Sequence, residues 1–541
     1  MRLPATTVNC LCGNGQIGVD TVVELPVRFL NPLARWTFPH SRMRESLMST
    51  RSAIKETREM PELPEYRNLI SGELCAPASG SYLDVENPAT GETWARIPAS
   101  DKADVNAAAD AAAAAFPAWS ALAAAQRGYF LTKIGELFAQ HGEDLVTLEI
   151  QDSGFPVGKS LARFGPGLQF LWNRAAASTL DAVTGKSVTL APDMLGITRR
   201  EPYGVVAVIV PWNAPIGIMS NKVACALAAG NTVVVKPAEQ ASVSVLRFAE
   251  LVAQVLPPGV LNIVSGTGEV VGDALVRHRH IRKITMTGST ETGRAIQHAA
   301  ADLLTPSVFE LGGKSPNIVF ADADLDAATI GVTTLGIFTP NAGQGCVAGS
   351  RILLQRPIFD DMVERIQAVV DTLVLGDPLD PATTMGPIIS GAQLDRVVGY
   401  LEIGKKEADL LFGGRHGGDL VPQALSGGHW VEPTLFKATD NSLRICQEEI
   451  FGPVGVAIPF DTEEEALAIA NDCRYGLASG VWTRDLARAH RFVREIESGT
   501  VWVNTYFQTR YELPFGGIKD SGYGHDDVLA FTREKAAVIQ S

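Results

Sequence analysis

Residues 204–320 alternate between short, continuous apolar runs and longer stretches with amphipathic spacing. The first run, Val205–Val210, is mostly β-branched, which is typical of a strand buried on both faces. The same reasoning predicts strands at 232–235, 260–264 and 281–287 and helices at 216–229, 244–255 and 272–276. This order predicts a parallel sheet with helices on both faces, and ligands then bind beyond the carboxyl ends of the strands.

Weaker patterns flank this segment. Residues 66–86 predict an edge hairpin, and Ser100 is the expected N-cap of a helix through the Ala-rich stretch to Ala115. Residues 312–515 repeat the alternation less regularly, which predicts a second α/β domain. Ser187–Leu190 alternate polar and apolar residues, as a half-buried strand does.

Length and composition narrow the classes of protein. A chain of 541 residues is too long for one hydrophobic core, so two or more domains are expected. With 46 % hydrophobic and 20 % charged residues it is typical of a globular protein rather than a disordered one. Its net charge of -14 disfavours nucleic acid and anionic membrane surfaces. No apolar run reaches the ~18 residues of a transmembrane helix, so no membrane partner is expected.

The seven cysteines follow no repeating spacing, which argues against a disulfide framework and for a reducing, cytoplasmic setting. Cys10 and Cys12 form a lone C-x-C, too weak a signal to predict a metal site. The first fifty residues hold five arginines and three acidic residues. Because Met43 and Met48 offer later starts, we expect 1–60 to be a leader that is unfolded or not natively translated. A transit peptide is the alternative.

Two segments follow predicted strands and could bind a cofactor. Gly288–Gly293 lies between a strand and a helix, where backbone N–H groups and the helix dipole favour an anion. Its G-x4-G spacing differs from the three-glycine dinucleotide fingerprint, so an ordinary tight turn is the alternative. Lys236 and Glu239 end another strand, where a carboxylate can accept hydrogen bonds from a ribose diol. A solvated strand end is the alternative there.

Two further residues could carry chemistry. Glu310 lies between Phe309 and Leu311, and poor solvation there would raise its pKa toward that of a general base. Cys346 follows Gly345, so little side-chain bulk shields its thiol from a substrate. A buried structural cysteine is the alternative, and one Cys with one Glu does not decide between them.

Six segments together resemble the aldehyde dehydrogenase superfamily, over roughly residues 65 to 541. They occur in the family's order and at close to its spacings: Pro211-Trp212-Asn213, Lys236 to Glu239, Gly288 to Gly293, Glu310 to Lys314 with Cys346, Glu448 to Pro453, and Pro514 to Lys519 with Ser521-Gly522. The resemblance implies a Rossmann-like cofactor domain, a second α/β catalytic domain and a small β oligomerisation hairpin. The corresponding ranges are 61–182 with 202–311 for the cofactor domain, 312–512 for the catalytic domain, and 183–201 with 513–541 for oligomerisation.

The resemblance also implies roles for single residues. Cys346 matches the nucleophile, Glu310 the base that activates water, Asn213 the oxyanion-hole amide and Lys222 a lysine that arranges the site. The matched cofactor-binding residues are Pro211, Trp212, Lys236, Glu239, Gly288, Ser289, Gly293, Glu449 and Phe451. The implied reaction is NAD(P)-dependent oxidation of an aldehyde to a carboxylic acid. It passes through a thiohemiacetal and a thioester on Cys346, which Glu310 helps to hydrolyse.

The implied cofactor is NAD rather than NADP. A carboxylate at Glu239 accepts hydrogen bonds from the ribose hydroxyls and repels the 2′-phosphate of NADP. Lys236 nearby would offset part of that repulsion, so NADP remains the alternative.

Departures from the family's pattern bear on the substrate. Small or short residues occur where relatives carry bulkier ones, at Pro340, Gly345, Val347, Ala214, Gly217 and Asn221, and Tyr506, Phe507 and Tyr511 are candidates for the other side of the pocket. This predicts room for a bulky or aromatic aldehyde. A semialdehyde dehydrogenase that binds a distal carboxylate with Arg510 is the alternative within enzymes. A non-catalytic binding protein is the alternative outside them. His525-Asp526 stands where relatives carry an Arg-Glu pair.

The family's projecting hairpin maps onto Val188 to Arg200. An exposed strand edge needs a partner for its backbone groups, so we expect a homodimer or homotetramer.

Overall fold

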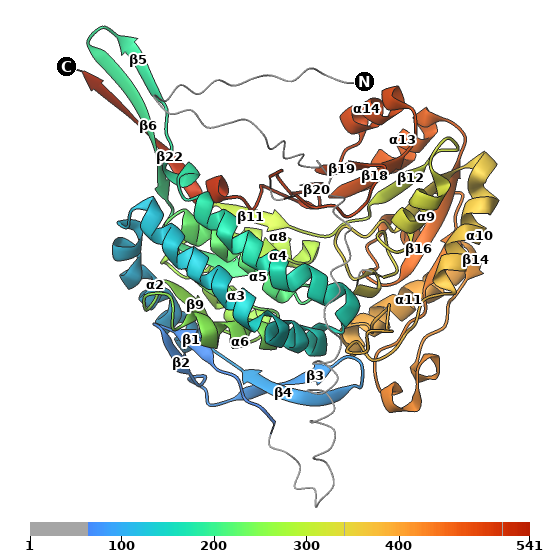
Figure 1. Ribbon diagram of the computed structural model, residues 1–541, viewed down its shortest axis with the longest axis horizontal. Helices are drawn as coiled ribbons and strands as arrows, with labels where there is room; N and C mark the ends of the chain where they lie inside the picture. Colours follow the sequence, from blue (N-terminus) through green and yellow to red (C-terminus); the bar gives the residue numbers. More distant parts are fainter. Residues whose placement is uncertain (1–62, 340, 511, 541) are drawn as a thin grey trace, which may run out of the picture. The chain divides into compact units, whose positions relative to one another are not determined.

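The alternating segment forms the predicted parallel sheet in the computed structural model, which describes residues 63–339, 341–510 and 512–540, without the side chains of 159–165 (Figure 1). The leader 1–60, Pro340 and Tyr511 therefore lie outside the described residues. The parallel strands are β7 (Val205–Ile209), β8 (Thr232–Lys236), β9 (Leu261–Ile263), β10 (Ile281–Thr287) and β11 (Ser307–Glu310).

This sheet has eight strands in the order β2-β1-β9-β8-β7-β10-β11-β21. The antiparallel strands at its edges are β1 (Asn68–Ile70), β2 (Glu73–Cys75) and β21 (Gly522–Tyr523). The edge hairpin predicted within residues 66–86 is thus confirmed by β1 and β2. A second hairpin follows, made of β3 (Tyr82–Asn87) and β4 (Glu92–Pro98).

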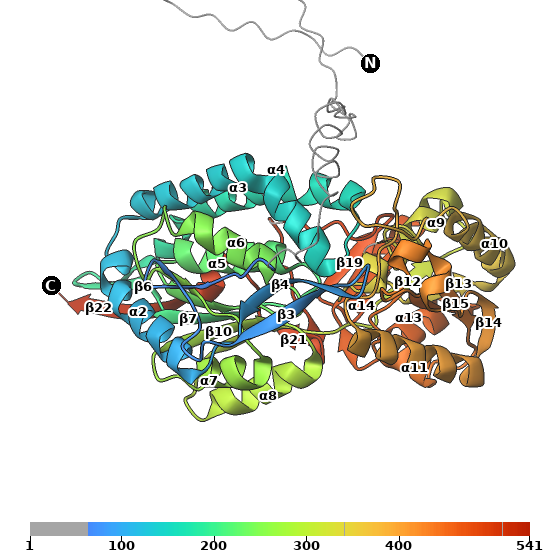
Figure 2. The same cartoon turned by 90° about the horizontal axis from the view of Figure 1, so that it is seen from below.

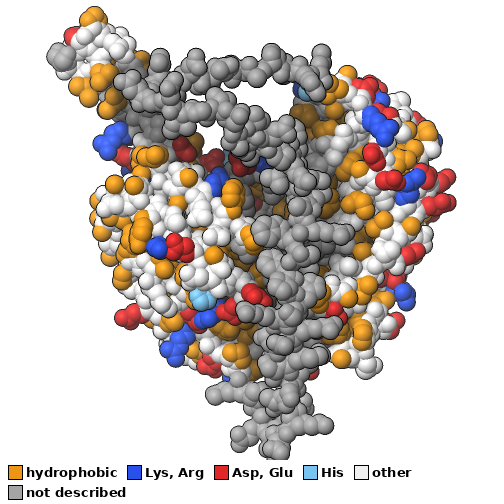
Figure 3. Space-filling model, viewed as in Figure 1, with side chains coloured by type: hydrophobic (Ala, Val, Ile, Leu, Met, Phe, Trp, Pro, Cys, Tyr) orange, Lys and Arg blue, Asp and Glu red, His pale blue; other side chains and the backbone are white. Residues whose placement is uncertain are grey.

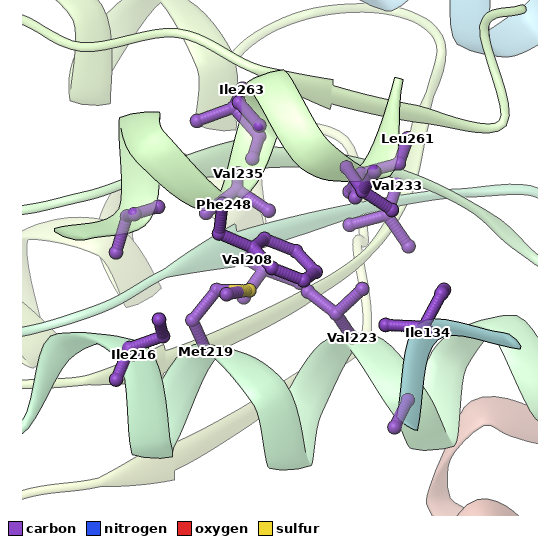
Figure 4. Packing of buried hydrophobic residues seen from close by; sticks show 14 of the residues in the cluster. Ile134, Val208, Ile216, Met219, Val223, Val233, Val235, Phe248, Leu261 and Ile263 are labelled. Atoms are coloured by element: carbon purple, nitrogen blue, oxygen red, sulfur yellow. The ribbon is translucent and has the colours of Figure 1, made fainter. Parts of the chain in front are cut away.

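Helices cover both faces of the sheet, as predicted (Figure 2). One face carries α3 (Ala124–Ser153), α4 (Val157–Ala177), α5 (Pro215–Ala228) and α6 (Val243–Val252), and the other α2 (Lys102–Ser120), α7 (Asp273–Val276) and α8 (Thr290–Ala301). Along β7, Val206 and Val208 pack in the core under α3–α6, whereas Val205 and Ala207 pack in the core under α2, α7 and α8. Figure 4 shows Phe248 of α6 packed with apolar side chains of α5 and the sheet.

The N-cap predicted for α2 is wrong by one residue. Asp101 caps the helix, because its carboxylate accepts from the Ala103 N–H and the Asp104 side chain accepts from the Asp101 N–H. The Ser100 hydroxyl instead accepts a hydrogen bond from Asn68 at 2.7 Å, within the core. The helix also continues past Ala115 to Ser120.

A second α/β unit follows along the chain. Its seven strands, in sheet order, are β14 (Asp409–Phe412), β15 (Thr434–Lys437), β16 (Val454–Phe460), β13 (Arg351–Gln355), β12 (Pro316–Val319), β18 (Ala478–Trp482) and β19 (Thr500–Val503). All neighbours are parallel except β14 and β15. The accompanying helices are α9 (Leu325–Val332), α10 (Phe359–Val370), α11 (Gly391–Glu407), α12 (Arg444–Gln447), α13 (Glu463–Asn471) and α14 (Leu486–Glu495). The predicted second α/β fold is confirmed.

Short elements complete the chain. They are β17 (Tyr475–Gly476), β20 (Ile518–Lys519), the π-helix η2 (Gly268–Gly272), and the 3-10 helices η1 (Asp181–Val183), η3 (Asn341–Gly343), η4 (Arg356–Ile358), η5 (Gly418–Leu420), η6 (Gln423–Leu425) and η7 (Val528–Phe531). None of the described helices combines the length and apolar character needed to cross a membrane.

The predicted hairpin projects from the part of the chain that holds the eight-stranded sheet, as β5 (Ser187–Ala191) and β6 (Met194–Pro202), and β22 (Thr532–Gln540) pairs with β6 (Figure 1). The half-buried alternation expected for Ser187–Leu190 is wrong for the single chain. Val188 and Leu190 are each 52 % exposed, and Figure 3 shows hydrophobic side chains gathered on this projection. Their exposure leaves an apolar surface without cover within the described chain.

Candidate active site

The ends of four parallel strands align in one row at the carboxyl edge of the first sheet. Lys236 is in register with Ile209, Ile209 with Met286, and the next residue of β10, Thr287, with Glu310. Neighbouring strands lie about 4.8 Å apart, so Lys236 and Glu310 are separated by roughly 14 Å across three strand spacings. The candidate cofactor and catalytic residues of this sheet therefore share one edge.

Cys346 lies in a loop between η3 and β13 that is held from several sides. The Gln344 side chain donates to the carbonyl oxygens of Asn341 (3.0 Å) and Pro387 (3.1 Å) and accepts from the Ile389 N–H (2.9 Å). These three bonds fix the loop two residues before the nucleophile candidate. Gly345 has open space where a side chain would be, and Cys346 itself is partly buried.

Tyr506 also holds this loop, through a hydrogen bond from its buried side chain. Its hydroxyl donates to the Val347 carbonyl oxygen at 2.8 Å, and its side chain is fully buried. The prediction that Tyr506 lines the substrate pocket is therefore wrong, because the ring packs beneath the nucleophile loop. Phe507 is partly exposed, in a left-handed conformation with φ of 54°.

Asn213 meets the nucleophile loop directly. Its side-chain Nδ2 donates to the Gln344 carbonyl oxygen at 3.0 Å, and the Asn341 side chain donates to the Asn213 carbonyl oxygen at 3.1 Å. An amide nitrogen carries two N–H groups, so one of them remains for a substrate oxygen. This geometry suits stabilisation of a negative charge that develops on a carbonyl oxygen bound beside Cys346.

Burial controls the electrostatics of the two reactive groups. Burial, followed by the negative charges of Glu310 and Glu449, raises the pKa of the Cys346 thiol to about 12, although the backbone N–H groups of Val347 and Cys346 oppose the shift. Burial, reinforced by the charge of Asp526, also raises the pKa of Glu310 well above its usual range, while Lys222 opposes it. Both carboxyl oxygens of Glu310 are buried without a hydrogen-bond partner among the described residues. A thiol that needs deprotonation thus lies near an unusually basic carboxylate.

Asp526 is a site residue whose role sequence reasoning missed. Lys222, fully buried on α5, pairs with the Asp526 carboxylate and donates to the Thr285 hydroxyl at 2.9 Å. That hydroxyl donates in turn to Asp526 at 2.8 Å. The departure at His525-Asp526 was the available signal, because a changed acidic residue is where a buried lysine would find its counter-ion.

The two glycines of the Glu310–Lys314 segment let three parts of the chain meet. A Cβ on Gly312 would overlap the Glu449 carboxylate, and a Cβ on Gly313 would overlap the carbonyl oxygen of Cys346. The Gly313 N–H donates to the Glu449 carboxylate at 2.9 Å. Glycine at both positions is therefore required for Cys346 and Glu449 to approach this backbone.

The Glu449 loop is positioned by α11. Arg396 donates to the Glu449 carbonyl oxygen at 2.6 Å, and Gln393 donates to that of Phe451 at 2.9 Å. Trp212 packs edge-on against Phe451, with ring centroids 5.2 Å apart. Burial raises the pKa of Glu449 to about 7. Sequence reasoning missed Arg396 and Gln393, which no motif marks.

The remaining cofactor candidates lie at the same sheet edge. Lys236 pairs with Glu239 at 3.1 Å, burial lowers the pKa of Lys236, and the Glu239 side chain stays 33 % exposed and so accessible to a diol. Ser289 caps α8 by accepting from the Thr292 N–H, whereas Gly293 packs against Leu311, so the second glycine serves helix packing.

A carboxylate, a helix N-terminus and an aromatic pair along one edge fit the parts of a dinucleotide. No group of three or more His, Cys, Asp or Glu side chains that could hold a metal occurs in the described part of the chain.

One face of α5 supplies the small residues expected around a substrate. Ala214, Gly217 and Asn221 are partly exposed and recur at helical spacing. Arg510, the candidate for a distal carboxylate, is exposed.

Comparisons with known proteins agree with this geometry. The sequence model of the aldehyde dehydrogenase family matches residues 75–537. The fluoroacetaldehyde dehydrogenase of Streptantibioticus cattleyicolor is 43 % identical over 473 residues, covering 86 % of this chain and 91 % of that protein. PnpE from Pseudomonas sp. WBC-3 has a solved structure that is 40 % identical, with a TM-score of 0.85 over 88 % of this chain and 98 % of its own, and PnpE was also solved with nicotinamide adenine dinucleotide. The indole-3-acetaldehyde dehydrogenase AldA of P. syringae, solved as a mutant with NAD+, is 37 % identical, with a TM-score of 0.85 over 91 % of this chain and 99 % of its own.

Gly313 and Gly345 allow a matched test of the close backbone approach at Cys346. Gly313→Ala forces its Cβ against the Cys346 carbonyl oxygen, and we expect a loss of about 1–3 kcal/mol of stability, as for other overpacked sites. Gly345→Ala meets open space and should change stability by less than about 0.5 kcal/mol. Urea unfolding followed by tryptophan fluorescence measures both. Equal midpoints for the two variants would contradict the required approach.

Proposed function

The chain belongs to the aldehyde dehydrogenase family and oxidises aldehydes to carboxylic acids, and from that premise we propose that its reaction uses NAD and passes through a thioester on Cys346. The observation that carries the proposal is the convergence of Cys346, Asn213 and Glu310. Asn213 bonds to the nucleophile loop at 3.0 Å, and the Glu310 charge acts on the Cys346 thiol. A binding protein without chemistry would have no need for this combination.

The first step joins the Cys346 sulfur to the aldehyde carbon. Because burial raises the pKa of the Cys346 thiol, its proton must leave before the attack. Glu310, whose charge acts on the thiol, can accept that proton, but water can accept it as well, so the main role of Glu310 is in the later hydrolysis. The carbonyl oxygen becomes negative as the bond forms. The second Asn213 N–H and the Cys346 backbone N–H stabilise that charge, by roughly 2.7–4 kcal/mol for each donor.

Collapse of this tetrahedral adduct yields the thioester. Bound NAD supplies the acceptor for the hydride that leaves the substrate carbon. Lys236 and Glu239 would hold one ribose and Glu449 the other, with Trp212 and Phe451 beside the nicotinamide. Pro211, Gly288, Ser289 and Gly293 complete the matched surface, where Ser289 and the α8 N-terminus favour the pyrophosphate.

Glu310 then completes the cycle. Its carboxylate takes a proton from water, the water oxygen attacks the thioester carbon, and the carbon–sulfur bond breaks to release the acid and the Cys346 thiol. Burial is the main cause of the raised Glu310 pKa, and the charge of Asp526 adds to the shift whereas that of Lys222 opposes it.

We predict that Glu310→Gln slows steady-state turnover while still releasing a burst of about one NADH per active site, because the thioester forms but hydrolyses slowly. Wild-type turnover should rise with pH at values above the ordinary carboxyl range as Glu310, whose pKa is raised, becomes ionised, and this rise should be lost in the variant. Stopped-flow NADH absorbance measures both.

Cys346→Ala is the control for this experiment. It should give neither burst nor turnover and should still bind NAD. A missing burst in Glu310→Gln would show that Glu310 is needed before the thioester, and turnover in Cys346→Ala would overturn the nucleophile assignment.

The proposed preference for NAD over NADP rests on Glu239. A 2′-phosphate of about −1.5 to −2 charge would face this carboxylate at the end of β8, and Lys236 offsets the repulsion only in part because Lys236 already pairs with Glu239. Glu239→Gln should narrow the ratio of kcat/KM for NAD to that for NADP, measured with one aldehyde. A wild-type preference for NADP, or an unchanged ratio, would show that Glu239 does not set the choice.

We propose a bulky or aromatic aldehyde as substrate. The small or short residues Ala214, Gly217 and Asn221 are partly exposed, which supports this proposal, and a neighbour at 37 % identity is named for an indole aldehyde. Arg510 is exposed, so nothing in its setting favours the semialdehyde alternative. The partner is then a small molecule. The free thiols among the described cysteines accord with a reducing, cytoplasmic setting.

We also propose the division of labour implied by the resemblance. Residues 61–182 and 202–311 bind the cofactor, 312–512 carry the nucleophile, and 183–201 with 513–541 join subunits. The free edges of β5 and β22 and the exposed apolar residues on them support a homodimer or homotetramer.

The assembly is testable with matched surface substitutions. We expect sedimentation at micromolar concentration to give a dimer or tetramer, and Val188→Lys with Leu190→Lys to shift it toward monomer, because charge would replace the apolar surface of β5. Val493→Lys on α14, a site of similar exposure (48 %), should leave the assembly unchanged. A monomeric wild type, or equal effects of the two changes, would refute the role of the hairpin.

A further inference from the structure

Two helices that begin beside the site lack caps of their own. The N-cap of α5 is Ala214, which has no side-chain acceptor, and the Ser242 N-cap of α6 makes no capping bond. The Ser242 hydroxyl instead donates to the Ala238 carbonyl oxygen at 2.7 Å. The first N–H groups of a helix need acceptors when they are buried, so these must come from elsewhere.

Both acceptors come from α3, one helical turn apart. Glu149 Oε2 accepts from the Ile216 N–H in the first turn of α5 at 3.1 Å. Asp152 Oδ2 accepts from the N–H groups of Val243 (2.7 Å) and Ser244 (3.3 Å) in the first turn of α6. The Ser244 hydroxyl donates to Glu149 Oε2 at 2.9 Å, which links the two carboxylates through one residue.

These carboxylates are buried, with residue exposures of 2 % for Glu149 and 0 % for Asp152. Burial of a carboxylate is costly unless hydrogen bonds and local charge offset it. Two helix N-termini supply both, because their N–H groups and dipoles favour negative charge. Burial nevertheless raises the pKa of Asp152 well above its usual range, with the Ser244 and Val243 N–H groups opposing the shift.

Each capped helical turn follows a loop of the proposed site, one with the oxyanion residue and the other with the residues proposed to bind the cofactor ribose. Ile216 follows the oxyanion residue Asn213 by three positions, so Glu149 holds the end of that loop. Asp152 holds the end of the loop that begins with Lys236 and Glu239, which is further tightened by the Ala241 N–H donating to Ala238. The helix bodies are held separately, through apolar packing of Met219 and Phe248 (Figure 4).

We propose that Glu149 and Asp152 are positioning residues that set the oxyanion loop and the adenosine-ribose loop relative to each other, each governing a different kinetic constant. Glu149 governs the chemical step through Asn213, and Asp152 governs NAD affinity through Lys236 and Glu239. This inference rests on the proposed function and adds to it a control exerted from α3, outside the residues that contact substrate or cofactor.

The test is a split between kcat and KM. Glu149→Gln should lower kcat and the burst rate by about tenfold and change the KM for NAD less than about twofold, since misplaced catalytic groups cost rate. Asp152→Asn should raise both the KM and the Kd for NAD by about tenfold and change kcat less than about twofold. Each change keeps the side-chain shape and replaces one carboxyl oxygen with an amide nitrogen, which cannot accept a hydrogen bond.

Asp322→Asn is the matched control. Asp322 also accepts backbone N–H groups, from Arg484 and Asp485 before α14, in the second sheet unit. It should lower the melting temperature without splitting kcat from KM. Ser244→Ala, which removes only the link between the carboxylates, is the milder variant if the others fail to fold, and it should move both constants by two- to fivefold.

Proportional changes of kcat and KM in both variants, or changes that follow melting temperature as in Asp322→Asn, would overturn the proposal. The Kd for NAD, from titration of tryptophan fluorescence, is read without turnover. An inactive wild type that still binds NAD would therefore refute the proposed reaction while leaving the Asp152 prediction open to its own result.

Discussion

The parallel register of β8, β7, β10 and β11 is the constraint on which the site depends. It ends four strands in one row, so that the helices after β7, β8 and β10 all begin at the same edge. Three helix N-termini then converge, and their partial positive charges favour acidic groups there. Glu149 and Asp152 use this field for positioning, and Glu310 closes the row with a carboxylate that no described donor satisfies. The fold thus supplies a surface suited to an anionic cofactor before any single side chain is considered.

Burial without a hydrogen-bond partner is the feature that supports the proposed role of Glu310 as a base. A buried polar atom without a hydrogen bond lowers stability, and such atoms are retained where function needs them. Lys222 and Asp526, in contrast, are buried as a pair. A buried lysine needs a counter-ion, and removal of either partner would leave an unpaired buried charge. The charge of Asp526 raises the pKa of Glu310, and the charge of Lys222 lowers it. Burial is therefore the main cause of the raised Glu310 pKa, and the neighbouring ion pair acts on it in two opposing directions.

Local patterns predicted the first sheet well, and β10 has the predicted bounds Ile281–Thr287 because Gly288 and a capped helix follow at once. Prediction from local patterns failed where contacts with residues distant in the sequence determine the position of a side chain. Ser100 bonds to Asn68 inside the core, Tyr506 turns beneath the nucleophile loop, and the Lys222–Asp526 pair joins residues 304 positions apart. Strand β5 is a further case. Its alternating pattern predicts a half-buried strand, but the described chain does not cover its apolar residues. The site residues came from resemblance, whereas their support by Gln344, Gln393 and Arg396 is visible only in three dimensions.

Helix α5 has one partly exposed face and one buried face. Ala214 at its N-cap, and Gly217 and Asn221 along the helix, are partly exposed. On the opposite face, Ile216, Met219 and Val223 are fully buried against the core (Figure 4). The first turn is fixed from α3, and Lys222 is fixed by Asp526, whose carbonyl oxygen accepts from the Asn221 side chain at 3.3 Å. Ala214 and Gly217 thus take no part in these bonds, whereas Asn221 helps to hold the Asp526 that acts on Lys222 and Glu310.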